Sequence, residues 1–383
     1  MPAPLRERLS RELDERRGQG LFRSFPASGD HQAGASIDLS TNSYLDLHKN
    51  VEIRSEALRL AKGDLSGNLA SRLIKETSPL CRELETELAA WKGTETALIF
   101  NSGYAANLGI LQALCRRDTE VFSDRLNHAS LIDGMLLSGC RIHRYRHGDM
   151  ADLKNRLAAS KAVEKIIVTD TVFSMDGDVA PVAGICACAK DHGAMVMVDE
   201  AHATGIFGAT GSGIAGLSGC ADAIDIRMGT LSKAIAGLGG FFTGSALVRD
   251  YLVNHSRSLI YSTGLPHSVI AWDLAAVRHL RQHPEEGAEL LRIAEKFRSG
   301  INDLGFDTLR STTQIIPCCV GDTMQASQLS RFLTERGIIA PAIRPPTVPQ
   351  GSSRVRFSVH LGLTEHEIIT VLSALQEWKS RHG

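Results

Sequence analysis

The chain of 383 residues is too long for one ordinary core, so two domains of about 150 residues each are expected. Hydrophobic residues make up 43%, which excludes a mainly disordered protein, and the net charge of -1 argues against a nucleic-acid-binding surface. The eight cysteines form no C-x-x-C pair, which favours free thiols in a reducing compartment. The N-terminus lacks the apolar core of a signal peptide and no apolar run could span a membrane, so we expect a soluble cytoplasmic protein.

The N-terminal part predicts an amphipathic helix over 1–17, because Leu5, Leu9 and Leu13 recur every fourth position among charged residues. A turn-rich connector leads to a short strand at 37–45. Two helical patterns follow, at 51–62 and 79–92. After that the pattern alternates, with strands expected at 97–100, 120–124, 141–146, 165–173, 194–200, 225–231 and 239–245, and helices at 104–115, 127–139, 150–160 and 182–192.

Strands that alternate with helices at this spacing predict an α/β fold with a mostly parallel sheet covered on both faces. A long helical pattern over 269–300 is broken near His283 and Pro284 and predicts a pair of linker helices. Beyond it, mixed strand and helix patterns predict a smaller α+β C-terminal domain. We therefore expect an N-terminal helix and strand segment at 1–45, a large domain at 46–270 and a small domain at 271–383.

The chemistry is concentrated between Val198 and Gly240. Asp199 ends an apolar strand, and ligands of open α/β sheets bind outside the carboxyl ends of the strands. A carboxylate at that place can pair with a pyridinium nitrogen, and a lysine whose pKa is lowered can attack an aldehyde. With His202 nearby and Lys233 in the small, polar segment GTLSKA, this stretch predicts pyridoxal phosphate (PLP) held by Lys233 as a Schiff base. The alternatives are a helix cap or salt bridge for Asp199 and a surface position for Lys233.

A phosphate site is expected where NSGYAAN (101–107) joins a strand to a helix. Backbone N–H groups at a helix start bind anions, and a glycine permits close approach, so Gly103 and Tyr104 are the candidate donors. His128 stands at the start of another helix and could stack on an aromatic ring, although an ordinary helix-start histidine is the alternative. Additional hydroxyl groups are offered by Thr230, Ser262 and Thr263.

Arg344, Arg354 and Arg356 are candidates for carboxylate recognition, because arginine binds carboxylates in a bidentate manner. Arg354 and Arg356 are two apart and therefore lie on the same face of a strand, with a solvated face as the alternative.

Two other sequence patterns resemble ligand-binding motifs but do not predict a site. GSGIAG (211–216) matches the dinucleotide fingerprint, but no strand precedes it. His143 and His147 are four apart, yet no acidic ligand lies near them in the sequence, so no metal site is expected.

The motifs DEAHATGIFG, GTLSKAIAG, NHASLIDG, SGYAAN and TDTVFSMDGDVAPV resemble, in order and spacing, those of the α-oxoamine synthases. These are fold-type-I PLP enzymes that condense an amino acid with an acyl thioester and release carbon dioxide. The resemblance runs from RELDERR near the start to RVRFSVH near the end, and it implies a homodimeric acyltransferase. IRPPTVP and IYSTGLP are most similar to members that join L-alanine to a pimeloyl thioester, carried by coenzyme A or acyl carrier protein, in biotin biosynthesis. The alternative is a member that uses glycine or another acyl chain, as in 2-amino-3-oxobutyrate formation.

The resemblance also implies a role for each candidate residue. Lys233 binds the cofactor aldehyde, Asp199 faces the ring nitrogen and His128 stacks on the ring. The intact set of Lys233, Asp199, His202 and His128 disfavours a non-catalytic binding protein of the same fold. The remaining implied contacts are those of Ser174 and His202 with the ring hydroxyl; Gly103, Tyr104 and Thr230 with the phosphate; Ser262 and Thr263 with the partner subunit's phosphate; Arg356 with the amino-acid carboxylate; Arg23 and Thr347 with the acyl substrate; and Asn42 and His128 with substrate.

Two stretches depart from the family pattern. In YLDL, Asp46 stands where the family usually has glycine. Within residues 67–81, which the resemblance places near the acyl entrance, Lys75 and Glu76 replace a small polar turn and Cys81 replaces a frequent histidine.

Overall fold

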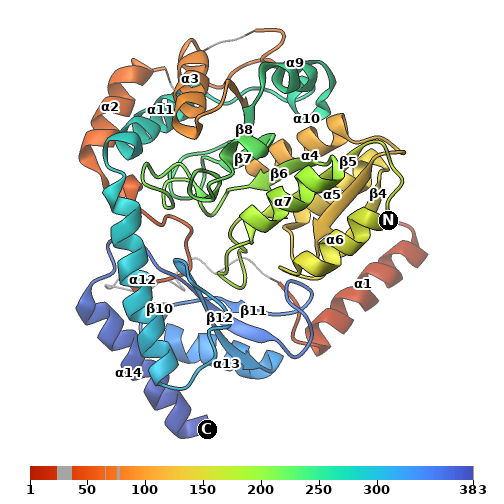
Figure 1. Ribbon diagram of the computed structural model, residues 1–383. Coiled ribbons are helices and arrows are strands. Elements are labelled where there is room, and N and C mark those ends of the chain that lie inside the picture. The colour runs from red at the N-terminus through yellow and green to blue at the C-terminus, as the bar shows by residue number, and fades with distance from the viewer. Residues whose placement is uncertain (24–36, 65, 76–77, 383) are drawn as a thin grey trace.

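The protein, seen in a computed structural model, is described for residues 1–23, 37–64, 66–75 and 78–382. A seven-stranded sheet occupies the upper part of Figure 1, in the order β2-β8-β7-β6-β5-β3-β4. Only β8 runs antiparallel to its neighbours among these strands, which confirms the mostly parallel sheet predicted from the sequence. The strands are β2 (Thr96–Phe100), β3 (Glu120–Asp124), β4 (Arg141–Tyr145), β5 (Lys165–Asp170), β6 (Met195–Asp199), β7 (Ile226–Thr230) and β8 (Gly240–Gly244).

Helices cover both faces of this sheet, and alternate residues of each strand enter two different cores. In β2, Ala97 and Ile99 belong to one core, whereas Leu98 and Phe100 belong to the other. This double burial explains why the strands are nearly continuous apolar runs. The second core contains residues of α4 (Gly103–Leu114), α5 (Ala129–Ser138), α9 (Ala246–His255) and α10 (Arg257–Ile260); the first contains residues of α2 (Val51–Ala61), α3 (Leu80–Lys92), α6 (Met150–Ala159) and α7 (Val182–His192).

A smaller three-stranded antiparallel sheet lies below, with β12 (Ser353–Ser358) between β9 (Ile315–Gly321) and β11 (Ala342–Ile343). It packs against α13 (Thr323–Thr334), and α14 (Glu365–His382) packs against α13, which fits the α+β pattern predicted for the C-terminal part. α11 (His267–Gln282) and α12 (Glu285–Asp303) break at His283 and Pro284 as predicted, and α12 descends from the large sheet to the small one. The domain boundaries themselves stay predictions.

The predicted strand at 37–45 is mostly wrong. Only β1 (Ile37–Asp38) forms, in parallel with β10 (Ile338–Ile339). Beyond it, Asp38 Oδ1 accepts the N–H of Ser40 and Thr41 Oγ1 accepts that of Ser43, both at 2.9 Å. Short polar side chains compete with a strand ladder in this way, so the segment turns instead. The short helical turns are η1 (Leu47–Lys49), α8 (Ile214–Leu217) and η2 (Ala221–Ala223).

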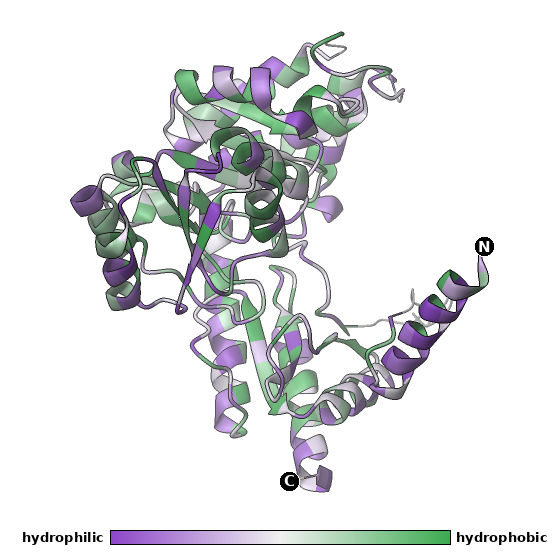
Figure 2. Ribbon diagram, turned by 90° about the vertical axis from the view of Figure 1, so that its right-hand side faces the viewer, coloured by the Kyte–Doolittle hydropathy of each residue, from purple (hydrophilic) through white to green (hydrophobic). Residues whose placement is uncertain are grey.

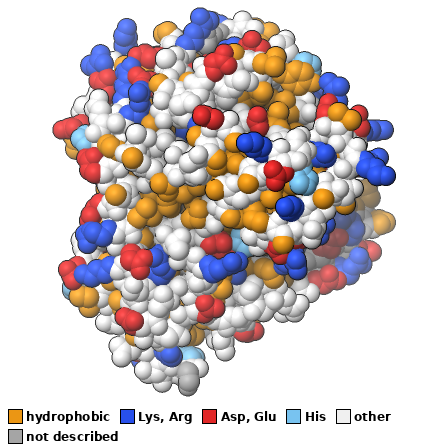
Figure 3. Space-filling view, in the orientation of Figure 1, with side chains coloured by type: hydrophobic (Ala, Val, Ile, Leu, Met, Phe, Trp, Pro, Cys, Tyr) orange, Lys and Arg blue, Asp and Glu red, His pale blue; other side chains and the backbone are white. Residues whose placement is uncertain are grey.

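The predicted N-terminal helix forms as α1 (Ala3–Gly18), and Figures 1 and 2 show it projecting from the body of the molecule. None of its residues is buried, so its leucine stripe packs against no core within the described chain. Figure 3 shows hydrophobic side chains gathered across the middle of one face, with charged side chains mainly around them. Among the described residues, no helix has both the length and the apolar character needed to cross a bilayer.

Candidate active site

The carboxyl edge of the seven-stranded sheet brings Asp170, Asp199 and Thr230 together at the ends of β5, β6 and β7. Asp199 is buried, and its carboxylate accepts hydrogen bonds from Asn107 Nδ2 at 2.7 Å and from the N–H of Ala201 at 2.8 Å. Within the described residues, no cationic side chain lies within ion-pair distance of it. Since a buried charge is costly without an opposite one, this carboxylate is suited to a cationic ligand group.

Lys233 is half-buried three residues beyond Thr230, and its Nζ lies 2.9 Å from His202 Nε2. Burial lowers the pKa of Lys233 to about 8, although the negative charges of Asp199 and Asp170 oppose this shift. A substantial fraction of the amine is therefore unprotonated near neutral pH. Because only an unprotonated amine attacks a carbonyl, Lys233 is prepared to bind an aldehyde.

His202 is buried, and its pKa is held well below the usual range by burial and by the positive charges of Lys233 and Arg356. Its Nδ1 lies 2.7 Å from the hydroxyl of Tyr44, which donates to Asn42 Oδ1 at 3.0 Å. With that proton committed to Asn42, His202 Nδ1–H donates to the tyrosyl oxygen and Nε2 accepts from Lys233. Burial raises the pKa of Tyr44 to about 12, so its hydroxyl stays protonated.

The same network reaches the small sheet. Arg356 on β12 donates from Nη2 to Asn42 Oδ1 at 3.1 Å and to the Tyr44 hydroxyl at 3.3 Å. Its guanidinium is buried, its Nε has no hydrogen-bond partner, and no carboxylate of the described residues lies within ion-pair distance. Arg356 therefore has the free donor and the uncompensated charge that a ligand carboxylate would satisfy.

The other two arginine candidates are engaged by the protein itself. Arg354 is buried on the same strand and forms an ion pair with Asp176. Arg344 donates to the carbonyl of Gly20 and, at 3.4 Å, to Ser327 Oγ. Neither of these arginines contacts the network around Lys233 in the described structure.

His128 caps the start of α5, and its Nδ1 lies 2.7 Å from Ser130 Oγ. Asn107 Nδ2 donates to that hydroxyl at 2.9 Å and to Asp199 as well, so one amide group links the histidine to the carboxylate. The His128 side chain is exposed, which leaves its ring accessible for stacking. The ring of Tyr104 stands edge-on to it, with the centroids 6.4 Å apart.

The phosphate site predicted from the sequence lies at the start of α4. Ser102 Oγ accepts the N–H of Ala105 at 3.0 Å, which leaves the first N–H groups of the helix, at Gly103 and Tyr104, for another acceptor. A Cβ at Gly103 would lie 3.3 Å from Thr230 Oγ1, so glycine permits this close approach. Thr230 Oγ1 is also 2.8 Å from Ser232 Oγ, which adds a second hydroxyl.

The remaining predicted residues lie around this centre. Ser174 is half-buried on the turn that follows β5, and Ser262 and Thr263 follow α10. The carbonyl of Thr263 accepts from Asn101 Nδ2 beside the start of α4.

Arg23 Nη2 donates to Thr347 Oγ1 at 3.3 Å, and both residues line a pocket of about 260 Å³ together with Arg344. The structure thus brings Arg23 and Thr347 together, but neither contacts Lys233 or Arg356. Lys75 is exposed and Cys81 is buried, whereas Glu76 lies outside the described residues.

Four contributors to the site were not identified from the sequence, namely Tyr44, Asn107, Ser130 and Asp170. Asp170 could have been predicted from the sequence, because it ends a buried strand just as Asp199 does. The two residues are paired in the register of β5 and β6. Burial and the charge of Asp199 raise the pKa of Asp170 well above the usual range. Its Oδ2 accepts the N–H of His128 at 2.7 Å.

The GSGIAG segment serves packing instead of nucleotide binding. It is preceded by turns, and its second half forms most of the four-residue α8. A Cβ at Gly213 would lie 2.3 Å from Glu200 Oε1. Glu200 points away from Asp199, as strand alternation predicts, and forms a fully buried ion pair with Lys92 at 2.9 Å.

The expectation that His143 and His147 lack acidic neighbours was wrong. His143 Nε2 lies 3.1 Å from Glu120 Oε2, and His147 lies between Asp124 and Asp178. The acidic groups come from β3 and from the turn after β5, which sequence spacing does not bring near. Ligand atoms of His147, Asp176 and Asp178 lie within 4.8 Å of one another, but Asp176 is already paired with Arg354.

The donor set at the sheet edge fits PLP. The cofactor presents an aldehyde, a pyridinium nitrogen and a phosphate. Lys233 offers the amine for the aldehyde, Asp199 a buried carboxylate without a cation, and the start of α4 a set of N–H donors.

Comparison with known proteins agrees with this assignment. The family model for aminotransferase class I and II matches residues 35–375. The chain is 47% identical to an 8-amino-7-oxononanoate synthase of Citrifermentans bemidjiense over 92% of both chains, and 43% identical to one of Alkalilimnicola ehrlichii over 96% of both.

Solved structures with the same fold include a serine palmitoyltransferase of S. paucimobilis with bound PLP, at TM-score 0.90 and 30% identity over 97% of both chains. An 8-amino-7-oxononanoate synthase of Francisella tularensis superposes with TM-score 0.78 at 24% identity, over 91% of this chain and 98% of that one, which supports the fold alone.

Proposed function

Because the chain belongs to the aminotransferase class I and II family and, within it, to the PLP-dependent α-oxoamine synthases, we propose that it condenses L-alanine with a pimeloyl thioester to form 8-amino-7-oxononanoate. The observation that carries this proposal is the short chain of contacts from Lys233 through His202 and Tyr44 to Arg356. It connects a reactive amine to a buried guanidinium that suits an amino-acid carboxylate. The name shared by relatives at 41–47% identity favours alanine and a pimeloyl group as the substrates.

Bound PLP supplies an aldehyde carbon that an amine can attack and a ring that takes up an electron pair. In the proposal, Lys233 holds the aldehyde carbon, Asp199 pairs with the ring nitrogen and His128 lies against the ring. The proposed further contacts are those of Ser174 and His202 with the ring hydroxyl, and of Gly103, Tyr104 and Thr230 with the phosphate.

Arg356 positions the amino acid: its Nε, which has no hydrogen-bond partner, receives the carboxylate, while the bonds from Nη2 to Asn42 and Tyr44 fix the plane of the guanidinium. Lys233 Nζ takes the proton from the alanine Cα, a role for which a pKa of about 8 is suitable. A bond then forms between that Cα and the thioester carbonyl carbon, the thiolate leaves and takes up a proton from solvent, and the alanine carboxylate leaves as carbon dioxide. Lys233 returns the proton to the same carbon.

The acyl substrate and the assembly are the finer parts of the proposal. We assign the acyl end to Arg23 and Thr347, which share one pocket, and either coenzyme A or acyl carrier protein to the carrier. Exposed apolar side chains on two adjoining segments, Leu69, Ile74 and Tyr261, favour a covering second copy, so that Ser262 and Thr263 reach the partner's phosphate. All eight cysteines are free thiols, which fits the proposed cytoplasmic location.

A substrate panel tests the proposal. Holoenzyme is mixed with L-alanine, glycine or L-serine, and each is combined with pimeloyl, acetyl or palmitoyl thioesters of coenzyme A and, for pimeloyl, of acyl carrier protein. Release of thiol and the mass of the product are recorded. Alanine with a pimeloyl thioester should give the highest kcat/KM. A preference for serine with palmitoyl-coenzyme A, or for glycine with acetyl-coenzyme A, would overturn the assignment and leave the family intact.

A further inference from the structure

A turn between the two sheets, residues Phe173–Asp178, borders the site and contributes only Ser174 to the proposed cofactor contacts. It leaves the end of β5, carries Ser174, and closes on itself through a 2.9 Å bond from the N–H of Gly177 to the carbonyl of Phe173. One side of this turn contacts the large sheet and the other contacts the small sheet. The turn therefore links the two sheets.

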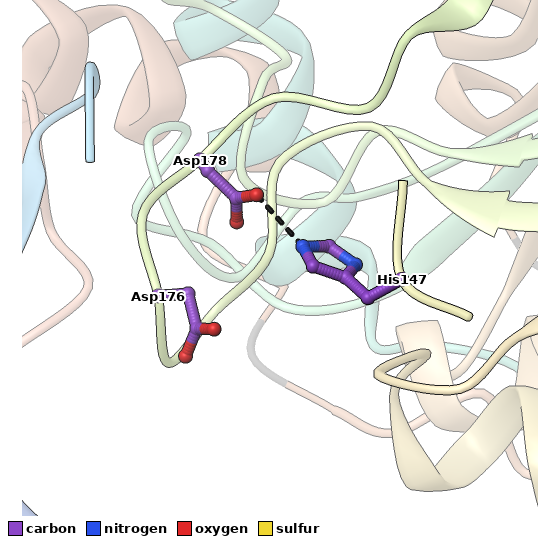
Figure 4. Close-up of side chains that lie close together, drawn as sticks. All are labelled: His147, Asp176 and Asp178. Carbon is purple, nitrogen blue, oxygen red and sulfur yellow. Dashed lines mark hydrogen bonds and ion pairs between the residues drawn. The ribbon is translucent and has the colours of Figure 1, made fainter. Parts of the chain in front are cut away.

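On the large-sheet side, the turn is held by His147, which follows β4. Its Nε2 lies 2.7 Å from Asp178 Oδ2 and its Nδ1 lies 3.0 Å from Asp124 Oδ1. Figure 4 shows the Asp178 carboxylate directed at the imidazole ring, with Asp176 farther along the same turn. The ring of Phe173 stands edge-on against His147, with the centroids 4.4 Å apart.

Both imidazole nitrogens of His147 face carboxylate oxygens, which only accept hydrogen bonds, so both nitrogens carry protons. Burial opposes this charge, but the hydrogen bonds to Asp124 and Asp178 outweigh it and raise the pKa of His147 to about 9. The imidazolium thus bridges the end of β3 and the turn at neutral pH. A metal ion at this place would have to displace that proton.

On the small-sheet side, Arg354 Nη1 donates to the carbonyl of Met175 at 3.1 Å and to Asp176 Oδ1. The backbone of the turn also makes contact there. A Cβ at Gly177, whose φ is +70°, would lie 1.9 Å from the carbonyl oxygen of Ile315, and Thr313 Oγ1 donates to the Gly177 carbonyl at 2.9 Å. Only glycine, which lacks a Cβ, fits at this close approach.

Arg354 and Arg356 lie two residues apart on one strand, and the alternation of side chains puts both on the same face. The position of Arg354 against the turn therefore sets the position of Arg356 relative to Lys233. We propose that His147 is a positioning residue for the amino-acid site: through Asp178 and the turn at 173–178 it holds β12 so that Arg356 meets the substrate carboxylate. This rests on the proposed function, because it assigns that carboxylate to Arg356.

The test compares His147→Ala with His143→Ala in the holoenzyme. His143 is a matched control, because it lies on β4 and contacts a carboxylate, Glu120, but it does not touch the turn. The dissociation constant of L-alanine is measured without thioester, from the change in visible absorbance. His147→Ala should weaken alanine binding about tenfold, a size typical of residues that act through others. His143→Ala should leave it unchanged.

Three further readouts separate positioning from a general loss of structure. The KM for the pimeloyl thioester should change much less than the KM for alanine. Hydrogen–deuterium exchange should increase in the peptide covering 171–181. In a double-mutant cycle, His147→Ala and Arg354→Met together should weaken alanine binding by less than the product of their separate effects, because either change already releases the turn.

Asp176→Asn weakens the contact with the small sheet and leaves the half-buried His147 in place, so it covers the case in which His147→Ala does not fold. It should weaken alanine binding in the same direction. The inference fails if wild-type enzyme binds alanine and both His147→Ala and Asp176→Asn bind it equally well, or if the two sites of the cycle act independently. Failure of the wild-type enzyme to bind alanine would instead remove the proposed function.

Discussion

The two sheets contribute to the site in opposite ways. At the carboxyl edge of the seven-stranded sheet, Asp199 ends β6 and Lys233 lies just after the end of β7, which is the parallel neighbour of β6. On the three-stranded sheet, Arg356 lies in the middle of β12 and reaches the site only because Asn42 and Tyr44 bridge the space to His202. The cofactor half thus depends on the fold of one sheet, whereas the substrate half depends on how two sheets are placed.

This difference distinguishes substitutions that remove a reacting group from substitutions that only shift the substrate-binding groups. A substitution at the large-sheet edge removes a group that reacts, so kcat should fall. A substitution between the sheets leaves the reacting groups intact and should alter amino-acid KM. The first two of the three predictions below use this contrast, and the third concerns stability; they run from the largest expected effect to the smallest.

Lys233→Ala removes the group assigned to hold the cofactor and to move the Cα proton. We expect kcat/KM to fall by about 10³-fold, within the range for loss of a general base, and the visible absorbance of bound PLP to change. Steady-state assays and an absorbance spectrum measure both effects. Lys161→Ala, at an exposed lysine, is the control. An unchanged spectrum together with full activity would show that another amine does this work.

Arg356→Met and Arg354→Met compare two buried arginines of one strand. Arg356→Met removes the charge-assisted bonds to the substrate, so the alanine KM should rise about 100-fold, but it leaves no protein carboxylate unpaired and should preserve Tm. Arg354→Met leaves Asp176 without its partner, so Tm should fall while the alanine KM rises less. Kinetics and thermal unfolding of the two variants measure this contrast. A larger KM effect from Arg354→Met would reverse the assignment.

Asp46 also joins two distant parts of the chain, because its carboxylate lies 2.8 Å from His360, which is 314 residues away in the sequence. Burial opposes its charge, but bonds to His360 and Lys49 lower its pKa to about 2 from 3.8. Because the folded-state pKa is depressed, the stabilisation is present above about pH 4 and disappears as the pH falls through about 2; it amounts to about 2 kcal/mol.

Urea unfolding of wild type and Asp46→Asn from pH 6 to pH 2 measures this contribution. The difference in free energy of unfolding between the two proteins should shrink as the pH falls. Asp222→Asn, at an exposed carboxylate without an ion pair among the described residues, should show no such trend. A difference that stays constant down to pH 2 would mean that the carboxylate charge contributes nothing.

Much of the large sheet could be predicted from the sequence because its strands are buried on both faces and are separated by helices of ordinary length. The position of Asp199 followed from the rule that ligands bind at strand ends. The segment at 37–45 was mispredicted because its alternating pattern is also compatible with turns made by Asp38 and Thr41, and local hydrogen bonds decided the outcome.

The contacts that complete the site could not be predicted in the same way. Tyr44 meets His202 across 158 residues, and Asn107 meets Asp199 across 92. Neither pair has a periodic or spacing signal, because each depends on how finished elements pack. The acidic partners of His147 were missed for this reason too. The departure at Asp46 had a partial signal, since aspartate tolerates the left-handed backbone seen there, with φ of 53°.

The burial of Lys233 also affects how the newly made enzyme matures. At pH 7 an ordinary lysine has about 0.03% of its amine in the free-base form, whereas a pKa of about 8 leaves about 10% of it free. Capture of an aldehyde proceeds through the free base, so the folded apoprotein has a reactive population some 300-fold larger than an exposed lysine would provide. The chain would then fold before Lys233 binds the cofactor, and the unfolded chain would capture little PLP in the cell.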